Sequence, residues 1–199
     1  MTNTIPDIID HLAGISPGSA GDTLRARRPV TREGAQASWL ALFVPSDAGD
    51  FSLAERFALA AFVSILHGQA EIAAFYGEKL ENEPNGKALR AAVEAAAAYG
   101  VTEGPYGHYP EGPLSSENRD GLIYRVSDAE RAVLGEKLSA LFEHAHLLVL
   151  RPRDAEPQAL SKLLQAGWST TSVVTASQLV AFLAFQIRVI AGLKVLNAT

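Results

Sequence analysis

The spacing of apolar residues is the feature that most constrains the fold, because it is helical along nearly the whole chain. No stretch shows the sustained alternation of apolar and polar residues that is typical of a half-buried strand. Helix starts are marked as well. Ser52 and Glu55 form a capping box, in which the serine oxygen accepts from a backbone N–H and the glutamate reaches back to the cap. The sequence therefore predicts an all-α fold.

The expected helices fall into two similar antiparallel units, because the pattern Ser-x-Ala-Glu-Arg at 52–56 returns at 127–131. Gly100 and Gly167 are expected to end the helices before them, and Gly100 to do so in the left-handed conformation. The predicted helices are a short one opening at 4–7, then 31–45, 52–80, 87–99, 127–148, 157–166 and 171–196.

A segment rich in glycine and proline, residues 100–126, separates the two units. Connections of this length without structure are uncommon in compact domains. Its tyrosines, Tyr106, Tyr109 and Tyr124, favour an ordered cover over a flexible linker. One structural domain is thus predicted, with an N-terminal helical arm at 1–50 and a main helical domain at 51–199.

Composition limits the chemistry that the chain can perform. It has 199 residues, 48% of them hydrophobic, and folding at this size buries roughly 70% of the surface of the unfolded chain, enough for one core. The net charge of −5 argues against nucleic acid as a partner. The chain contains no cysteine, which excludes disulfides, thiolate metal sites and thiol redox chemistry.

No targeting or membrane segment is expected. Residues 1–10 lack the basic and apolar stretches of a signal peptide. Residues 163–187 carry no charge, but their clean apolar part, Leu179 to Phe185, is shorter than the ~20 residues of a spanning helix. We therefore expect a cytoplasmic protein with no membrane partner.

Several stretches resemble one protein family. Residues 55–68, ERFALAAFVSILHG, are similar to the helix that carries the redox site in AhpD-like proteins, the group of alkylhydroperoxidase and carboxymuconolactone decarboxylase (CMD) domains. The order of LRP at 150–152, QAGWS at 165–169 and QLVAF at 178–182 resembles the peroxidase-related branch of that group. The resemblance covers most of residues 51–196. It implies an AhpD-like helical bundle that assembles as a homo-oligomer, from dimer to hexamer.

The groups that perform the family's chemistry are all replaced in this chain. That chemistry uses a glutamate, a C-x-x-C pair and a histidine, and the matching positions hold Phe57, then Gln69 and Ile72, then Tyr76. A peroxidase cycle needs a reactive thiolate and a resolving thiol. We therefore expect no thiol peroxidase activity and no cofactor.

If the family's pocket is kept, some residues of the first unit still suit acid/base chemistry. Gln69 and Tyr76 would hydrogen-bond a substrate, His67 would move a proton, and Arg56 would hold a carboxylate. The alternative is that Tyr76 packs in the core and that His67 with Glu71 is an ordinary surface pair.

The densest titratable cluster is Glu143, His144 and His146. His144 takes the place in the second unit that Gln69 holds in the first. Residues two apart on a helix point about 200° apart, so these two imidazoles are not expected to bind a metal together. The alternative to a functional role is an inward-facing histidine that is hydrogen-bonded to a backbone carbonyl.

The long segment offers its own candidates, His108 and the neighbouring Tyr109. A histidine flanked by aromatic residues suits a lid over a site, although simple loop packing is an equal alternative. A run of four arginines near the N-terminus suits a carboxylate or phosphate, or else pairing with nearby acids; it comprises Arg25, Arg27, Arg28 and Arg32.

Two functions are compatible with the sequence. The first is a thiol-free acid/base enzyme or small-molecule binder, acting on a small organic acid by decarboxylation or isomerisation. The second is a non-catalytic subunit of a related, cysteine-bearing peroxidase-like protein. For the first function, the expected catalytic residues are His67, Tyr76, His144 and His108, and the expected binding residues are Arg56, Gln69 and Tyr109.

Overall fold

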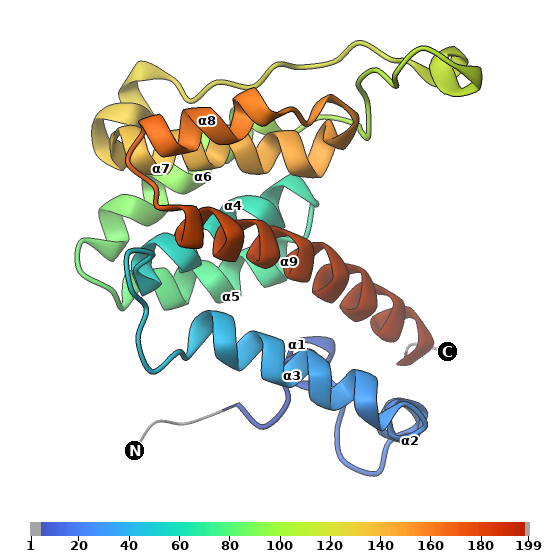
Figure 1. The fold of residues 1–199 in the computed structure, drawn as a ribbon. Coiled ribbons are helices and arrows are strands. Elements are labelled where there is room, and N and C mark those ends of the chain that lie inside the picture. Colours follow the sequence, from blue (N-terminus) through green and yellow to red (C-terminus); the bar gives the residue numbers. More distant parts are fainter. Residues whose placement is uncertain (1–4, 198–199) are drawn as a thin grey trace. The chain divides into compact units, whose positions relative to one another are not determined.

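The computed structural model describes residues 5–197, and the all-α prediction is confirmed (Figure 1). Within those residues there is no β-strand, only an isolated antiparallel bridge between Gly107 and Arg119. The helices are α1 (Ile8–Ala13), α2 (Ala20–Ala26), α3 (Pro29–Phe43), α4 (Leu53–Leu66), α5 (Ala70–Glu81), α6 (Gly86–Gly100), α7 (Asp128–Leu150), α8 (Pro157–Gln165) and α9 (Thr170–Asn197), with the short 3₁₀ helices η1 (Pro113–Glu117) and η2 (Pro152–Asp154).

The chain folds into two compact units. The larger unit is 48–180, which holds α4 to α8 and the first part of α9. The smaller unit is 1–47 together with 181–199, so it holds α1 to α3 and the rest of α9. The predicted division at residue 50 lies close to the first of these boundaries, but it assigns residues 181–199 to the larger part.

The predicted start of α4 is confirmed, whereas its predicted length is wrong. Ser52 and Glu55 form the complete capping box. The helix then ends at Leu66, because the next residues turn through Gly68 in the left-handed region (φ 67°), and α5 begins at Ala70. The predicted 52–80 helix is therefore two helices, and His67 and Glu71 do not lie on one helix face.

Gly100 ends α6 as predicted, but not by a left-handed turn. Val101, which caps the helix, has an ordinary φ of −66°. A Cβ on Gly100 would lie 3.1–3.3 Å from the side chains of Leu66, His146 and Tyr124. Close packing therefore explains this glycine.

The second unit does not repeat the first in detail. Ser127 caps α7 as Ser52 caps α4, but α7 has a kink at Gly135 (φ 75°, ψ 167°) that the apolar pattern does not indicate. The helix continues past His144, whereas Gln69 lies at the break before α5. The predicted equivalence of His144 and Gln69 is therefore wrong.

Aromatic side chains organise the core of the larger unit. Phe62 of α4 stacks on Phe142 of α7 with ring centroids 4.3 Å apart. Phe51 contacts Trp168 edge to face at 5.1 Å, and the Trp168 indole N–H donates to the carbonyl of Lys137 at 2.7 Å. These contacts join the start of α4, the middle of α7 and the segment before α9.

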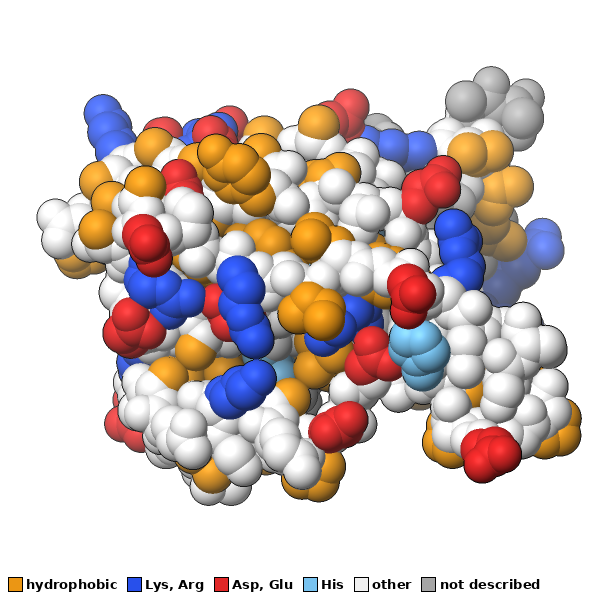
Figure 2. Space-filling view, turned by 90° about the horizontal axis from the view of Figure 1, so that it is seen from above, with side chains coloured by type: hydrophobic (Ala, Val, Ile, Leu, Met, Phe, Trp, Pro, Cys, Tyr) orange, Lys and Arg blue, Asp and Glu red, His pale blue; other side chains and the backbone are white. Residues whose placement is uncertain are grey.

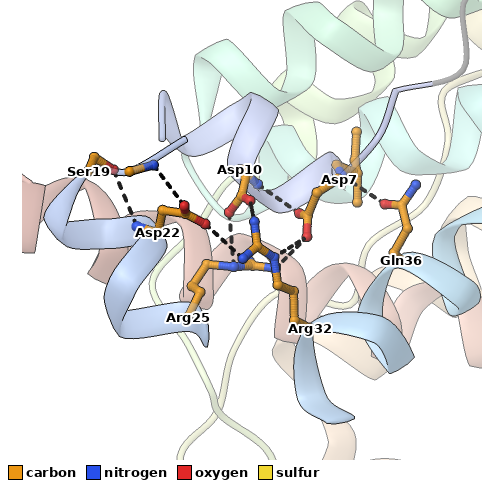
Figure 3. Close-up of polar contacts among 9 residues, drawn as sticks. Asp7, Asp10, Ser19, Asp22, Arg25, Arg32 and Gln36 are labelled. Carbon is orange, nitrogen blue, oxygen red and sulfur yellow. Dashed lines mark hydrogen bonds and ion pairs between the residues drawn. The ribbon is translucent and has the colours of Figure 1, made fainter. Parts of the chain in front are cut away.

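In the smaller unit, two of the four N-terminal arginines form a charged network with three aspartates (Figure 3). Arg25 contacts Asp7 at 2.7 Å and Asp10 at 2.9 Å. Arg32 contacts Asp22 at 2.8 Å and Asp7 at 3.2 Å, and it also pairs with Asp10. For these two arginines, pairing with nearby acids is thus the correct alternative.

The long segment between α6 and α7 is ordered by hydrogen bonds within itself and to α6. The Tyr106 hydroxyl donates to the Leu122 carbonyl at 2.7 Å, and the Tyr124 hydroxyl donates to the Ala96 carbonyl at 2.8 Å. Both tyrosines are buried.

Helix α9 is the only helix in the described part of the chain that is long and apolar enough to cross a membrane. The expectation that this helix is too short to span a membrane rests on its uninterrupted apolar run alone, Leu179 to Phe185. The whole helix, Thr170–Asn197, is long and apolar enough. One such helix is a weak indication, because the core helix of a soluble protein passes the same test. The cytoplasmic location stays a prediction.

Candidate functional site

The larger unit contains a cavity of about 580 Å³. We call it the α7–α8 cavity, because its walls come from α7, η2, α8 and parts of the segment before α7. Two of the predicted catalytic residues, His108 and His144, line it together with His146. Figure 2 shows a face of the molecule on which basic, acidic and histidine side chains lie together around a hollow.

His144 is the most unusual group in this cavity. His144 is only 7% exposed, and its two ring nitrogens are both buried without a hydrogen-bond partner in the described part of the protein. Burial lowers the pKa of its imidazole below the ordinary value, which favours the neutral ring. An unpartnered buried polar group costs about 1–3 kcal/mol, and functional sites are where folds commonly retain such groups.

His146 differs from His144 although it lies only two residues away. Its Nε2 lies 3.0 Å from the Gly100 carbonyl oxygen, which can only accept, so Nε2 carries the proton. The ring also stacks on Tyr124 at 4.7 Å. Burial lowers its pKa, while the hydrogen bond to Gly100 opposes that shift. His146 therefore fits the structural alternative considered from the sequence, and His144 does not.

Glu143 lies beside His144 but is fully engaged. Its carboxylate contacts Arg125 and Arg131, each at 2.7 Å, and accepts from the Val126 backbone N–H at 3.2 Å. These bonds fix the chain that enters α7. Glu143 is therefore a structural anchor at the edge of the cavity.

His108, which also lines the cavity, is held by η2. The Asp154 carboxylate accepts from the His108 backbone N–H at 2.8 Å, and the His108 ring lies 3.1 Å from Asp120. Gly107 permits this approach, because a Cβ there would lie 2.8–3.0 Å from the Asp154 carboxylate. The His108 side chain itself remains about half exposed.

Tyr109 does not line the cavity but supports a residue that does. The Arg153 guanidinium lies 4.3 Å from the centre of the Tyr109 ring and donates to the Glu117 carbonyl at 2.9 Å. Arg153 lines the cavity. The structure thus gives Tyr109 a positioning contact.

The predicted site residues of the first unit lie elsewhere. Arg56 is 5% exposed and donates to the carbonyls of Phe51 and Ala48, at 2.8 and 2.9 Å, so it holds the start of α4. Tyr76 of α5 is fully buried, as in its core-packing alternative. His67 follows α4, Gln69 precedes α5, and none of these four residues lines the α7–α8 cavity.

Sequence reasoning missed the basic residues of the cavity, which are Arg125, Arg151, Arg153 and Lys162. The available signal was the sequence RPRD at 151–154, where two arginines and an aspartate surround a proline at the end of a helix. In residues 5–197 no group of three histidine, cysteine or acidic side chains is placed to hold a metal ion.

Comparisons of this chain with protein-family models, with curated proteins and with solved structures give no match. The AhpD-like resemblance, its homo-oligomer and the partnership with a cysteine-bearing relative therefore stay predictions.

Proposed function

We propose that the protein binds a small molecule in the α7–α8 cavity and moves a proton to or from it through His144, as a thiol-free acid/base enzyme. The observation that carries this proposal is that His144 lines the cavity while both of its ring nitrogens are buried with no partner from the described chain. A bound molecule would supply the missing partner.

The protonation state of His144 supports the same role. A neutral imidazole has one nitrogen that accepts a proton and one that donates. With its pKa lowered by burial, His144 is in the form that acts as a general base at neutral pH. No thiol, metal or redox group is needed for such a step.

The dimensions of the cavity also support a small-molecule site. Ligand pockets commonly enclose about 300–1,000 Å³, and this cavity has about 580 Å³. Most of its polar groups lie on helices α7 and α8 and on the η2 turn, whose backbone bonds hold them in place, and the others lie on the segment before α7. Rigid elements of this kind position catalytic groups well.

NMR of the imidazole nitrogens in ¹⁵N-labelled protein tests the proposal. We expect small neutral and charged fragments to shift the His144 signals without shifting those of His67. Ala159 of α8 lines the cavity and is half-buried, so Ala159→Trp fills part of the space and should abolish these shifts.

The matched control is Ala91→Trp, at an exposed position of α6. This variant should bind the same fragments as the unmodified protein. The proposal is wrong if no fragment shifts His144, or if Ala159→Trp binds fragments as well as Ala91→Trp does.

A further inference from the structure

The basic side chains around the α7–α8 cavity differ in how strongly they are already paired within the protein. Arg125 is bound to Glu143 at 2.7 Å, and Arg153 donates to the Glu117 carbonyl over the Tyr109 ring. Arg125 is therefore already paired with an acid, and Arg153 is held in place by a carbonyl and an aromatic ring of the protein. Arg151 is only weakly paired with an acid, and Lys162 has no ion pair in the described chain.

Arg151 has donors that the protein leaves unused. Its Nε is buried without a hydrogen-bond partner in the described chain. A terminal nitrogen of its guanidinium lies 3.5 Å from Asp154, which is long for a charged hydrogen bond. Asp154 is also occupied on its other oxygen by the His108 backbone N–H. The guanidinium of Arg151 is therefore only partly neutralised.

Lys162 adds a second cation from α8. It is exposed and has no ion-pair partner within residues 5–197. Gln158, Ala159 and Lys162 all line the cavity, since residues three and four apart lie on the same helix face. Lys162 thus faces the same space as Arg151.

The unsatisfied groups favour a ligand that accepts hydrogen bonds. An arginine Nε can only donate, and a neutral His144 supplies one further donor and one acceptor. Glu156 is the one acid at the cavity whose side chain has no hydrogen bond or ion pair within the described chain, but it is exposed at the start of α8, whereas the unpartnered Arg151 nitrogen is buried. A buried donor without a partner is the more costly of the two.

We infer that the ligand of the α7–α8 cavity is a small organic anion, whose carboxylate or phosphate group is bound by Arg151 and Lys162 while the rest of the molecule lies against His144. This inference rests on the proposed function and adds the chemical class of its substrate. Both oxyanions suit an arginine, which binds their oxygens through parallel N–H donors.

Three probes of similar size separate the alternatives: benzoate, phenyl phosphate and the neutral benzamide. Binding is measured from the His144 ring signals of the unmodified protein. We expect one or both anions to bind at least about tenfold more tightly than benzamide, because a hydrogen bond to a charged group contributes about 1.5–3 kcal/mol. The stronger of the two anions identifies the headgroup as a carboxylate or a phosphate.

Two variants test the residues. Arg151→Met should weaken anion binding about tenfold or more. Lys162→Met should weaken it by a smaller factor, about two- to fivefold, because its side chain is exposed. The matched control is Lys87→Met at an exposed position of α6, which should leave binding unchanged. If Arg151→Met fails to fold, Lys162→Met and the comparison of probes still decide.

The outcomes separate this inference from the proposed function. If benzamide binds as tightly as both anions, the cavity is a ligand site but the anion inference is wrong. The inference is also wrong if Lys162→Met and Arg151→Met bind the anions like Lys87→Met. If no probe shifts His144, the proposed function and the inference both fail.

Discussion

His144 and His146 show how two neighbouring residues of one type acquire different roles. His146 donates a hydrogen bond to the Gly100 carbonyl and stacks on Tyr124, so its position is fixed by the fold. His144 has no such partner within the described chain, although it is nearly as deeply buried. The sequence places both on one helix, but only the tertiary contacts distinguish them.

Burial of His144 makes stability depend on pH. Its pKa in the folded protein lies below its ordinary value of 6.5, so the unfolded chain binds the proton more readily. Its contribution to stability is therefore complete above pH 6.5 and is lost as the pH falls below that value. Chemical denaturation between pH 7.5 and 5 should show a smaller loss of unfolding free energy for His144→Gln than for the unmodified protein. An equal loss in the two proteins would contradict the assigned pKa direction.

Gly100 provides a second test at the scale of single residues. Gly100→Ala should destabilise the protein by about 1–3 kcal/mol, because the new Cβ crowds Leu66, His146 and Tyr124. Gly34→Ala is the matched control, since Gly34 lies in α3 with nothing within 4 Å of the added atom. That change should stabilise by about 0.5–1 kcal/mol. Equal effects of the two substitutions would show that packing does not explain Gly100.

At the scale of helices, local signals predict starts better than ends. The capping serines before α4 and α7 are visible in the sequence, because their bonds join residues three apart. The break at Gly68 and the kink at Gly135 are not visible, since a glycine in a helical pattern also fits a continuous helix. The α7–α8 cavity was equally hidden, because it depends on how α7, η2 and α8 pack.

The charged network of the smaller unit connects α1, α2 and α3 (Figure 3). Arg25→Met should destabilise the protein by about 3 kcal/mol, at the low end for a broken buried pair, because Arg32 still contacts both Asp7 and Asp10. Arg27→Met, at an exposed position, should change stability by less than about 0.5 kcal/mol. Urea unfolding of both variants checks this, and a similar stability for the two would mean that the network contributes little.

At the scale of the molecule, the candidate site and the charged network belong to different compact units. All residues that line the α7–α8 cavity come from 48–180, so the larger unit alone contains the site. The absence of cysteine applies to the whole chain and excludes a thiol-based cycle anywhere in it. The acid/base chemistry proposed at His144 needs no thiol.

Proton transfer at His144 is tested most directly by hydrogen–deuterium exchange at carbon. The protein is incubated in D₂O with two carbon acids, acetophenone, which is neutral, and 3-benzoylpropionate, which is an anion, and loss of the C–H signals beside the ketone is followed by proton NMR. We expect the unmodified protein and His67→Gln to accelerate exchange of at least one of them, and His144→Gln to lower that rate by about a hundredfold. Equal exchange rates with His144→Gln and with the unmodified protein would contradict the assignment of His144 as the proton-transferring group.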